Sequence, residues 1–375
     1  MSDAFELKED NGDRILKKYT GNQAEVVIPD GVTRIDWGAF KNCTNLISVV
    51  IPEGVTKIGS WAFEGCINLA SIILPKGLEL IESFAFKGCI GLQSLAFPEG
   101  VTEIENAAFE GCSSLTTISL PEGIKFDRST FIKTPLYDDQ PGKQVIIGNT
   151  YVSYTGKANK IVIPDGITAI NKEAFLNCKN LSSVIIPQGV KLIGTGAFSG
   201  CTSLSSVVIA NSVNKICRSA FEGCTSLISV VIPEGVMEIG GSTFSRCTSL
   251  ASIVIPEGVK KIEWSAFSGC TSLTTVVIPE SVTEIGDGVF RGCTSLTSVV
   301  IPQGVTEIGK SAFEGCTNLI SVVIPTGVEY IGESAFQNCN SLTSVVIPES
   351  VTKIGSGAFA NCTSLTSVVI PEGVM

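Results

Sequence analysis

A five-residue segment, Ile-Pro-x-Gly/Ser-Val, recurs with a repeat length of 23 residues, the spacing from Ile28 to Ile51. A single disturbed stretch interrupts this repeat. Its copies begin at Ile28, Ile51, Ile163, Ile186, Ile232, Ile255, Ile278, Ile301, Ile324, Ile347 and Ile370, with Leu74, Phe97 and Leu120 as variants. Thirteen of the 14 cysteines keep the same interval, and the disturbed stretch lies between Cys112 and Cys178. A repeat of this length is typical of small units that bury their apolar residues only against the next copy. The sequence therefore predicts one elongated stack of turns rather than two or three globular domains.

The stretch from residue 296 to 319 shows what one turn contains. Val299 and Ile301 alternate with Val300, so a short strand places the first two inside and Val300 outside. Pro302 ends this strand because it has no amide hydrogen for a sheet. Val305 and Ile308 are expected to face the same interior. A short helical or 3₁₀ turn should follow, in and after which Ala312, Phe313, Cys316 and Leu319 also face inward.

The position after Pro302 and Gln303 is glycine in most copies and serine in three of them. Gly304 is expected to supply a turn, and Ser212, Ser281 and Ser350 occupy its place elsewhere. A positive φ angle is therefore favoured at this position but is not obligatory.

Composition removes several classes of function. The chain has no histidine, which excludes mechanisms that need a histidine base or metal ligand. Its 26 basic and 36 acidic side chains give a net charge of −10, so it lacks an electrostatic footprint for nucleic acid. No run of about 18 apolar residues occurs, so no insertion into a membrane is expected.

The pattern IPEGVTEIGxxAFxGCTSLTSVV resembles the BspA-type leucine-rich repeat of bacterial and protozoan surface proteins. The resemblance covers nearly all of residues 22–375. It implies a leucine-rich-repeat solenoid, a curved right-handed α/β horseshoe that is mostly β with short 3₁₀ or helical turns and has a parallel β-sheet on its concave face. It also implies adhesion or protein binding at a cell surface rather than catalysis.

Two segments depart from the repeat and divide the chain into four parts. These are a leader with a β-hairpin cap at 1–27, leucine-rich repeats at 28–120, a degenerate repeat with a hairpin interruption at 121–162, and leucine-rich repeats at 163–375. A continuous solenoid from which the interruption bulges is favoured over a joint between residues 1–141 and 142–375.

The two irregular segments match each other. Tyr19-Thr-Gly21 and Tyr154-Thr-Gly156 are separated by the same distance in sequence as Cys43 and Cys178, and each precedes an Ile-Pro-Asp-Gly copy. We expect a hairpin in each, pairing 14–19 with 24–28 in the first. In the second, 144–147 pairs with 151–154 through a turn at Gly148-Asn149.

The two ends of the chain carry little information about compartment. The last copy stops at Met375 without a polar cap, so a truncated chain is favoured over an end covered by a partner or by end-to-end self-association. The first residues include Glu6, Glu9 and Asp10 and no apolar stretch, so no signal peptide is expected. The resemblance implies a surface or secreted protein, whereas a complete chain of this kind would be cytoplasmic.

Repeated cysteines and phenylalanines are interpreted as core rather than as sites. Thiols one turn apart all point the same way into an apolar interior, and no C-x₂-C spacing is present, so neither disulfides nor zinc are expected. Cys217 lies outside the ladder and is expected to be the one readily labelled thiol. Phenylalanines from Phe40 to Phe359 predict a stacked spine. No cofactor or metal is expected, because Gly194-Thr-Gly196 is only half of a phosphate loop.

Carboxylates also recur at one place in the repeat. Glu53, Glu99, Glu234, Glu257, Glu280 and Glu349 share it with Lys76, Gln188, Gln303 and Thr326. A solvated edge of the turn is therefore favoured over an acid/base pair. A carbohydrate-active enzyme that uses these carboxylates, or Asp138 and Asp139, is kept as a less favoured hypothesis.

The outward side of the strands is the surface most suited to a partner. We expect exposed ladders of hydroxyl and valine side chains there, at Ser229, Val231, Ser252, Val254, Thr275, Val277, Ser298, Val300, Ser321 and Val323. Tyr137, Tyr151 and Tyr154 in the interruption are a second candidate, because three of the five tyrosines gather there. A packed structural hairpin explains them equally well.

The favoured function is a non-catalytic scaffold that binds a protein or glycan through this face or through the interruption. The alternatives are a self-associating structural spacer and, less favoured, the solenoid enzyme.

Overall fold

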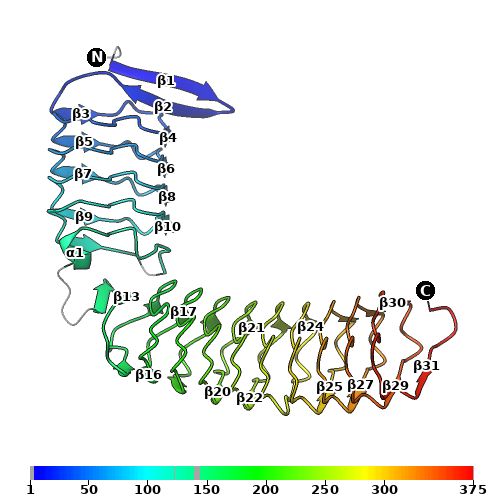
Figure 1. The fold of residues 1–375 in the computed structure, drawn as a ribbon. Helices are drawn as coiled ribbons and strands as arrows, with labels where there is room; N and C mark the ends of the chain where they lie inside the picture. Colours follow the sequence, from blue (N-terminus) through cyan, green and yellow to red (C-terminus); the bar gives the residue numbers. More distant parts are fainter. Residues whose placement is uncertain (1–3, 122, 139–143, 375) are drawn as a thin grey trace. The chain divides into compact units, whose positions relative to one another are not determined.

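The computed structural model describes residues 4–121, 123–138 and 144–374, and the chain forms two compact units, Met1–Ser153 and Tyr154–Met375. Each unit is a solenoid built from short parallel strands, which confirms the predicted fold class (Figure 1). Within the described residues the one helix is α1 (Pro135–Asp138). A single continuous solenoid stays a prediction.

One side of each unit carries what we call the Ser/Val sheet, a row of short parallel sheets formed by the predicted Ser-Val-Val segments. In unit 1 its strands are β3 (Glu25–Val27), β5 (Ser48–Val50), β7 (Ser71–Ile73), β9 (Ser94–Ala96) and β11 (Thr117–Ser119). In unit 2 they are β14 (Lys160–Val162), β16 (Ser183–Ile186), β18 (Ser206–Ile209), β20 (Ser229–Val231), β22 (Ser252–Val254), β25 (Ser298–Val300), β27 (Ser321–Val323), β29 (Ser344–Val346) and β31 (Ser367–Val369). Equivalent residues pair in register one repeat apart, as Ser298 does with Ser321.

A second sheet was not predicted, although the inward pair Val305 and Ile308 was. Its strands are two residues long and always end in isoleucine, so we call it the Ile sheet. Its repeat strands in unit 1 are β4 (Arg34–Ile35), β6 (Lys57–Ile58), β8 (Leu80–Ile81) and β10 (Glu103–Ile104). In unit 2 they are β15 (Ala169–Ile170), β17 (Leu192–Ile193), β19 (Lys215–Ile216), β21 (Glu238–Ile239), β23 (Lys261–Ile262), β24 (Glu284–Ile285), β26 (Glu307–Ile308), β28 (Tyr330–Ile331) and β30 (Lys353–Ile354). The two sheets lie on opposite sides of each unit (Figure 1).

The apolar core fills the space between the two sheets. Val299, Ile301 and Ile308 are buried as predicted, while Val300 and its counterparts point outward. The predicted phenylalanine spine is present in both units: neighbouring ring centroids lie 4.9 Å apart at Phe40–Phe63 and 5.6 Å apart at Phe244–Phe267. These distances are those of stacked rings.

The segment that was expected to form a short helical or 3₁₀ turn is a tight corner of single hydrogen-bonded turns rather than a continuous helix. Ser311 and Gly315 have φ angles of 55° and 74°, and a residue in the left-handed region interrupts a right-handed helix. The first of these positions recurs as Gly38, Trp61, Phe84, Ala107, Glu173, Gly196, Ser219, Ser242, Ser265, Gly288, Ser334 and Gly357. The corner reverses the chain through single i→i−3 hydrogen bonds of the 3₁₀ type, such as that from the Ala312 amide to the Gly309 carbonyl oxygen at 3.2 Å.

The expectation of a favoured positive φ at Gly304 is wrong for most copies. Gly304 is absent from the left-handed residues of the structure; what limits its size is the preceding turn, since an added Cβ would lie 3.2 Å from Thr283 Cγ2. Ser281 fits at the same position because its hydroxyl donates a hydrogen bond to the Val259 carbonyl at 2.7 Å. Close approach of neighbouring turns, rather than backbone conformation, explains the preference for small residues.

The first predicted hairpin has a different partner from the one expected. β2 (Asp13–Tyr19) pairs antiparallel with β1 (Phe5–Asp10) through a turn at Asn11-Gly12. The segment 25–27 is instead β3, the first strand of the Ser/Val sheet, and it pairs with β5. Both turn residues have positive φ angles, which is the requirement of a type I′ hairpin turn.

The second predicted hairpin is confirmed. β12 (Gln144–Ile147) and β13 (Thr150–Tyr154) are neighbours in the sheet order, on either side of Gly148-Asn149. Val145, Ile147 and Val152 join the hydrophobic core of unit 1. This hairpin therefore covers the last turns of that core.

Candidate functional site

The Ser/Val face of unit 2 is the outer surface of its Ser/Val sheet. The structure brings together there all ten predicted residues of the two ladders, and all ten are exposed: Ser229, Val231, Ser252, Val254, Thr275, Val277, Ser298, Val300, Ser321 and Val323. Val277 is 78% exposed and Val254 is 61% exposed. Thr275 and Val277 continue the ladders between β22 and β25 through isolated bridges to Ser298 and Val254.

The three tyrosines of the interruption have structural positions. The Tyr151 ring is fully buried and its hydroxyl donates to Gln144 Oε1 at 3.2 Å. Tyr154 is also buried, its hydroxyl accepts the Ala158 amide hydrogen at 2.7 Å, and Tyr137 is half-buried. A buried ring offers no surface to a partner, so Tyr151 and Tyr154 belong to the core.

The repeated Tyr-Thr-Gly motif has a shared physical explanation. Tyr19 and Tyr154 each begin a phenylalanine spine, with centroids 5.1 Å from Phe40 and 5.5 Å from Phe175. An added Cβ at the glycine two residues later, as at Gly156, would collide with the tyrosine ring. The motif therefore lets the chain pass over the ring that closes each spine.

All 14 cysteines are free, and the ten in the interior of the two stacks are buried as predicted. Each buried thiol donates a hydrogen bond to a phenylalanine carbonyl of the preceding turn, as Cys316 does to Phe290 at 3.1 Å. Burial raises the pKa of the Cys112 thiol to about 12, so the reactive thiolate is scarce near neutral pH.

Cys217 is not the exposed thiol that was expected. It is half-buried, and Cys43, Cys178 and Cys362 are half-buried too. Burial raises the pKa of the Cys217 thiol. Cys43 and Cys178 are the first cysteines of the two units and Cys362 is the last of unit 2, whereas Cys112, the last of unit 1, stays buried. Exposure is thus set by position in the stack as well as by place in the repeat.

Two of the recurring carboxylates have local structural partners. Glu53 Oε2 accepts the Lys76 amide hydrogen at 2.9 Å, and Glu280 Oε2 accepts that of Gln303 at 3.1 Å. These two carboxylates thus each join one turn to the next. Asp138 is exposed at the end of α1, and Asp139 lies outside the described residues. Across the described residues no group of three or more Asp, Glu, Cys or His side chains could hold a metal ion.

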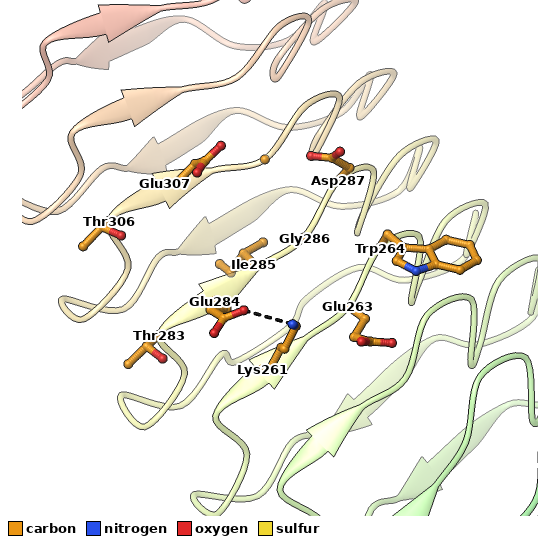
Figure 2. Close-up of a pocket in the computed structure, with 11 residues that line it drawn as sticks. Lys261, Glu263, Trp264, Thr283, Glu284, Ile285, Gly286, Asp287, Thr306 and Glu307 are labelled. Carbon is orange, nitrogen blue, oxygen red and sulfur yellow. Dashed lines mark ion pairs between the residues drawn. The ribbon is translucent and has the colours of Figure 1, made fainter. Parts of the chain in front are cut away.

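Sequence reasoning missed a hollow on the Ile sheet of unit 2, beside Trp264. The hollow has a volume of about 470 Å³. Figure 2 shows its lining, with Lys261, Glu284 and Glu307 on the strands and Asp287 near the indole. Two signals in the sequence could have indicated it. Trp264 is the only tryptophan of residues 154–375, and Glu284 and Glu307 occupy one position of adjacent repeats.

Charge is unevenly distributed around Trp264. Lys261 Nζ pairs with Glu284 Oε2 at 3.1 Å, while Glu263 Oε2 accepts the Gly241 amide hydrogen at 2.8 Å. A hydrogen bond with Glu263 raises the pKa of the Glu238 carboxyl, and partial burial adds to the rise. Carboxylates are therefore crowded here beyond what the nearby cations neutralise.

Two stacked parallel sheets, a constant repeat length and buried leucine, isoleucine and phenylalanine layers define a leucine-rich-repeat protein. A family model described as BspA type leucine rich repeat region (6 copies) matches residues 16–136, 145–274 and 260–375, and the chain belongs to this family. The resemblance inferred from the sequence is confirmed.

Solved structures of bacterial repeat proteins are similar to the chain. A leucine-rich repeat protein from Bacteroides ovatus is 26% identical, covers 100% of this chain and 88% of its own, and has a TM-score of 0.55. A leucine rich cell surface protein from Faecalibacterium prausnitzii is 30% identical over 98% of this chain and 93% of its own, with a TM-score of 0.41. No curated protein matches the chain. None of the described helices has the length and apolar character needed to cross a membrane.

Proposed function

We propose that the chain is a non-catalytic scaffold that binds a partner protein through the Ser/Val face of unit 2. The observation that supports this most directly is the unbroken ladder of exposed valines from Val208 to Val369. Contiguous apolar surface of this kind is characteristic of binding surfaces. The family membership agrees, because leucine-rich-repeat proteins are typically binding proteins rather than enzymes.

The composition of the face indicates the kind of contact it makes. Fully burying a valine is worth about 1.5 kcal/mol or more, and Val277 keeps 78% of its surface exposed. Each valine therefore contributes about 1 kcal/mol when a partner covers it. Tyrosine, tryptophan and arginine are absent from the ladder positions, so binding is spread over many weak contacts rather than concentrated in one anchor.

The test uses the full chain and a triple variant, Val254→Lys/Val277→Lys/Val300→Lys, which places charge on exposed positions. Immobilised purified proteins and glycans are probed with both, and Thr352→Lys on the Ile-sheet side serves as the matched control. We expect a protein ligand whose dissociation constant rises at least about tenfold in the triple variant and stays unchanged in the control.

Other results would contradict the proposal. One is a ligand that binds the triple variant as tightly as the unaltered chain. Another is binding confined to glycans. A third is release of reducing ends from a polysaccharide, which would indicate the enzyme. A fourth, concentration-dependent light scattering abolished by the triple variant without any ligand, would indicate the self-associating spacer.

A further inference from the structure

We infer that the hollow beside Trp264 is a second binding site, which receives the guanidinium or ammonium group of a basic segment of a partner protein. The site lies on the Ile sheet, on the opposite side of unit 2 from the Ser/Val face. The inference therefore does not rest on the proposed function of that face.

The floor of the hollow is bare backbone. Gly286 and Gly309 occupy equivalent places in adjacent turns, and both line the hollow. An added Cβ at Gly286 would lie 2.7 Å from the Trp264 amide nitrogen, and one at Gly309 would lie 2.7 Å from the Gly286 carbonyl oxygen. Close packing of neighbouring turns thus requires glycine at both positions, and without side chains there the backbone itself forms the floor of the hollow.

The walls carry an excess of negative charge. Glu263, Glu284, Asp287 and Glu307 line the hollow together with a single cation, Lys261, which already pairs with Glu284 at 3.1 Å. Asp287 Oδ1 accepts the Lys310 amide hydrogen at 2.7 Å, and the Lys310 ammonium pairs with Glu333 instead. Charge complementarity therefore calls for a positively charged occupant.

Glu307 is the sharpest departure from the pattern of the sheet. Along this face Lys215, Glu238, Lys261 and Glu284 alternate in sign, and β24 pairs in parallel with β26, which places Glu307 beside Glu284. Like charges opposite one another in a sheet cost stability. Glu307 has no ion-pair partner among the described residues. A cationic group bound between Glu284 and Glu307 would remove the repulsion between these two carboxylates.

Trp264 supplies the apolar part of the site. Its side chain is 46% exposed, and the Arg218 guanidinium carbon lies 5.9 Å from the centre of its ring. The indole therefore already holds one guanidinium of this chain, at a distance within the range of cation–π attraction. Figure 2 shows the ring projecting at the edge of the hollow, near Asp287. The methylene groups of a lysine or arginine side chain can pack on the indole while its charged group pairs with the nearby carboxylates.

The size of the hollow favours a peptide segment over a small ion. Its lining residues come from consecutive turns between Lys261 and Gly309, and strands one turn apart are separated by about 4.8 Å, so the hollow runs about 10 Å along the stack. Its carboxylates do not converge into a metal site within the described part of the chain. The net charge of −10 also attracts basic partners over longer distances.

The experiment titrates the full chain with a synthetic heptapeptide of alternating arginine and glycine, with a peptide of glutamine and glycine as the neutral probe. Binding is measured by calorimetry and by the fluorescence of Trp264 in a Trp37→Phe/Trp61→Phe background. The variants are Glu307→Gln and Trp264→Leu, and Glu329→Gln removes an exposed carboxylate that directly precedes β28 and lies outside the hollow.

We expect the arginine peptide to bind and to weaken as salt is raised. By calorimetry, Glu307→Gln raises its dissociation constant about threefold and Trp264→Leu about fivefold, while Glu329→Gln changes it less than either. Glu307→Gln also keeps or raises the thermal midpoint, because it removes like-charge repulsion, so its loss of binding cannot come from unfolding.

Three results would overturn the inference. The first is no binding of the arginine peptide to the unaltered chain. The second is equal binding of the neutral peptide. The third is an equal loss in Glu329→Gln and Glu307→Gln, which would show attraction to an acidic surface in general.

Discussion

At the scale of single residues, the corners of the turns carry the strongest constraint. Ser311 and Gly315 both adopt left-handed conformations, which cost a residue with a side chain about 1–2 kcal/mol. Their amide hydrogens bond the next turn, at Glu333 O (2.9 Å) and Gln337 O (2.8 Å). The corner is held in this shape because it must present those amides to its neighbour.

Two substitutions distinguish glycines that are required by their positive φ angle from glycines that are required by the close approach of the preceding turn. Gly315→Ala should lower the free energy of unfolding by about 1 kcal/mol, because alanine resists the φ of 74° although the nearest neighbouring atom lies 3.7 Å from its Cβ. Gly304→Ser should cost less than this, because the close atom, Thr283 Cγ2 at 3.2 Å from the added Cβ, belongs to a side chain and the serine hydroxyl can bond the preceding turn as that of Ser281 does. Urea denaturation measures both. Equal destabilisation by the two would contradict the distinction.

At the scale of elements, the phenylalanine spine is a continuous link between the turns of each unit. Phe267 is fully buried between Phe244 and Phe290, with ring centroids 5.6 and 5.5 Å away. Phe359 has a ring neighbour at Phe336 and is only half-buried. The contribution of each ring therefore depends on how many turns cover it.

Phe267→Ala should lower the free energy of unfolding by about 3–5 kcal/mol, as expected when a large buried side chain leaves a cavity. Phe359→Ala should cost less than half of that, because part of its surface is already in water. Chemical denaturation followed by circular dichroism compares the two variants. Costs that do not differ would argue against stacking as the source of stability.

Elements also show what a sequence of this kind can and cannot reveal. The Ser-Val-Val alternation was long enough to predict the strands of the Ser/Val sheet and which valine faces out. The Ile sheet was not predicted, because a strand such as β26 has two residues, too few for an alternating pattern. The first hairpin was misassigned because Asn11-Gly12, a strong turn signal, was not weighed against the partner residues 24–28.

The candidate sites divide in the same way. The Ser/Val face repeats every turn, so periodicity alone predicted its residues. The hollow beside Trp264 combines departures from the repeat, one tryptophan and two adjacent glutamates, with glycines that the repeat itself supplies at Gly286 and Gly309. The lining residues come from adjacent turns, so no single turn contains the whole site and its pattern does not reveal it.

At the scale of the whole molecule, the two units differ in how their carboxylates respond to acid. In unit 1, burial alone would raise the pKa of Glu82, but hydrogen bonds from Lys57 and Ser60 outweigh it and hold that pKa below its usual value. The pKa of Glu110 is also lowered, by Lys133 and Lys87. In unit 2, Glu263 raises the pKa of Glu238. The lowered pKa values in unit 1 and the raised pKa in unit 2 have opposite effects on the free energy of unfolding.

Lowered carboxyl pKa values stabilise unit 1 above the pKa of the unfolded chain, and this contribution is lost as pH falls through the folded pKa. The raised pKa of Glu238 has the reverse sign: its charged form destabilises unit 2, and the penalty fades as pH falls. Acidification from neutral pH should therefore lower the free energy of unfolding of unit 1 more than that of unit 2.

Tryptophan fluorescence can follow the units separately. Trp264→Phe leaves Trp37 and Trp61 as probes of unit 1, and Trp37→Phe/Trp61→Phe leaves Trp264 as the probe of unit 2. Adding Glu82→Gln should flatten the acid response of unit 1, whereas Glu238→Gln should stabilise unit 2 most at neutral pH. An identical pH dependence of the two units would contradict the assignment.

The in-register bonding of equivalent strands has a consequence for how such a molecule can vary. An interior turn touches only the turns before and after it, and both offer it nearly the same surface. Adding or removing one whole repeat within a stack would thus rebuild every bond with a new neighbour of the same type. The length of a stack is therefore set by how many copies it contains, while the chemistry of each face stays constant.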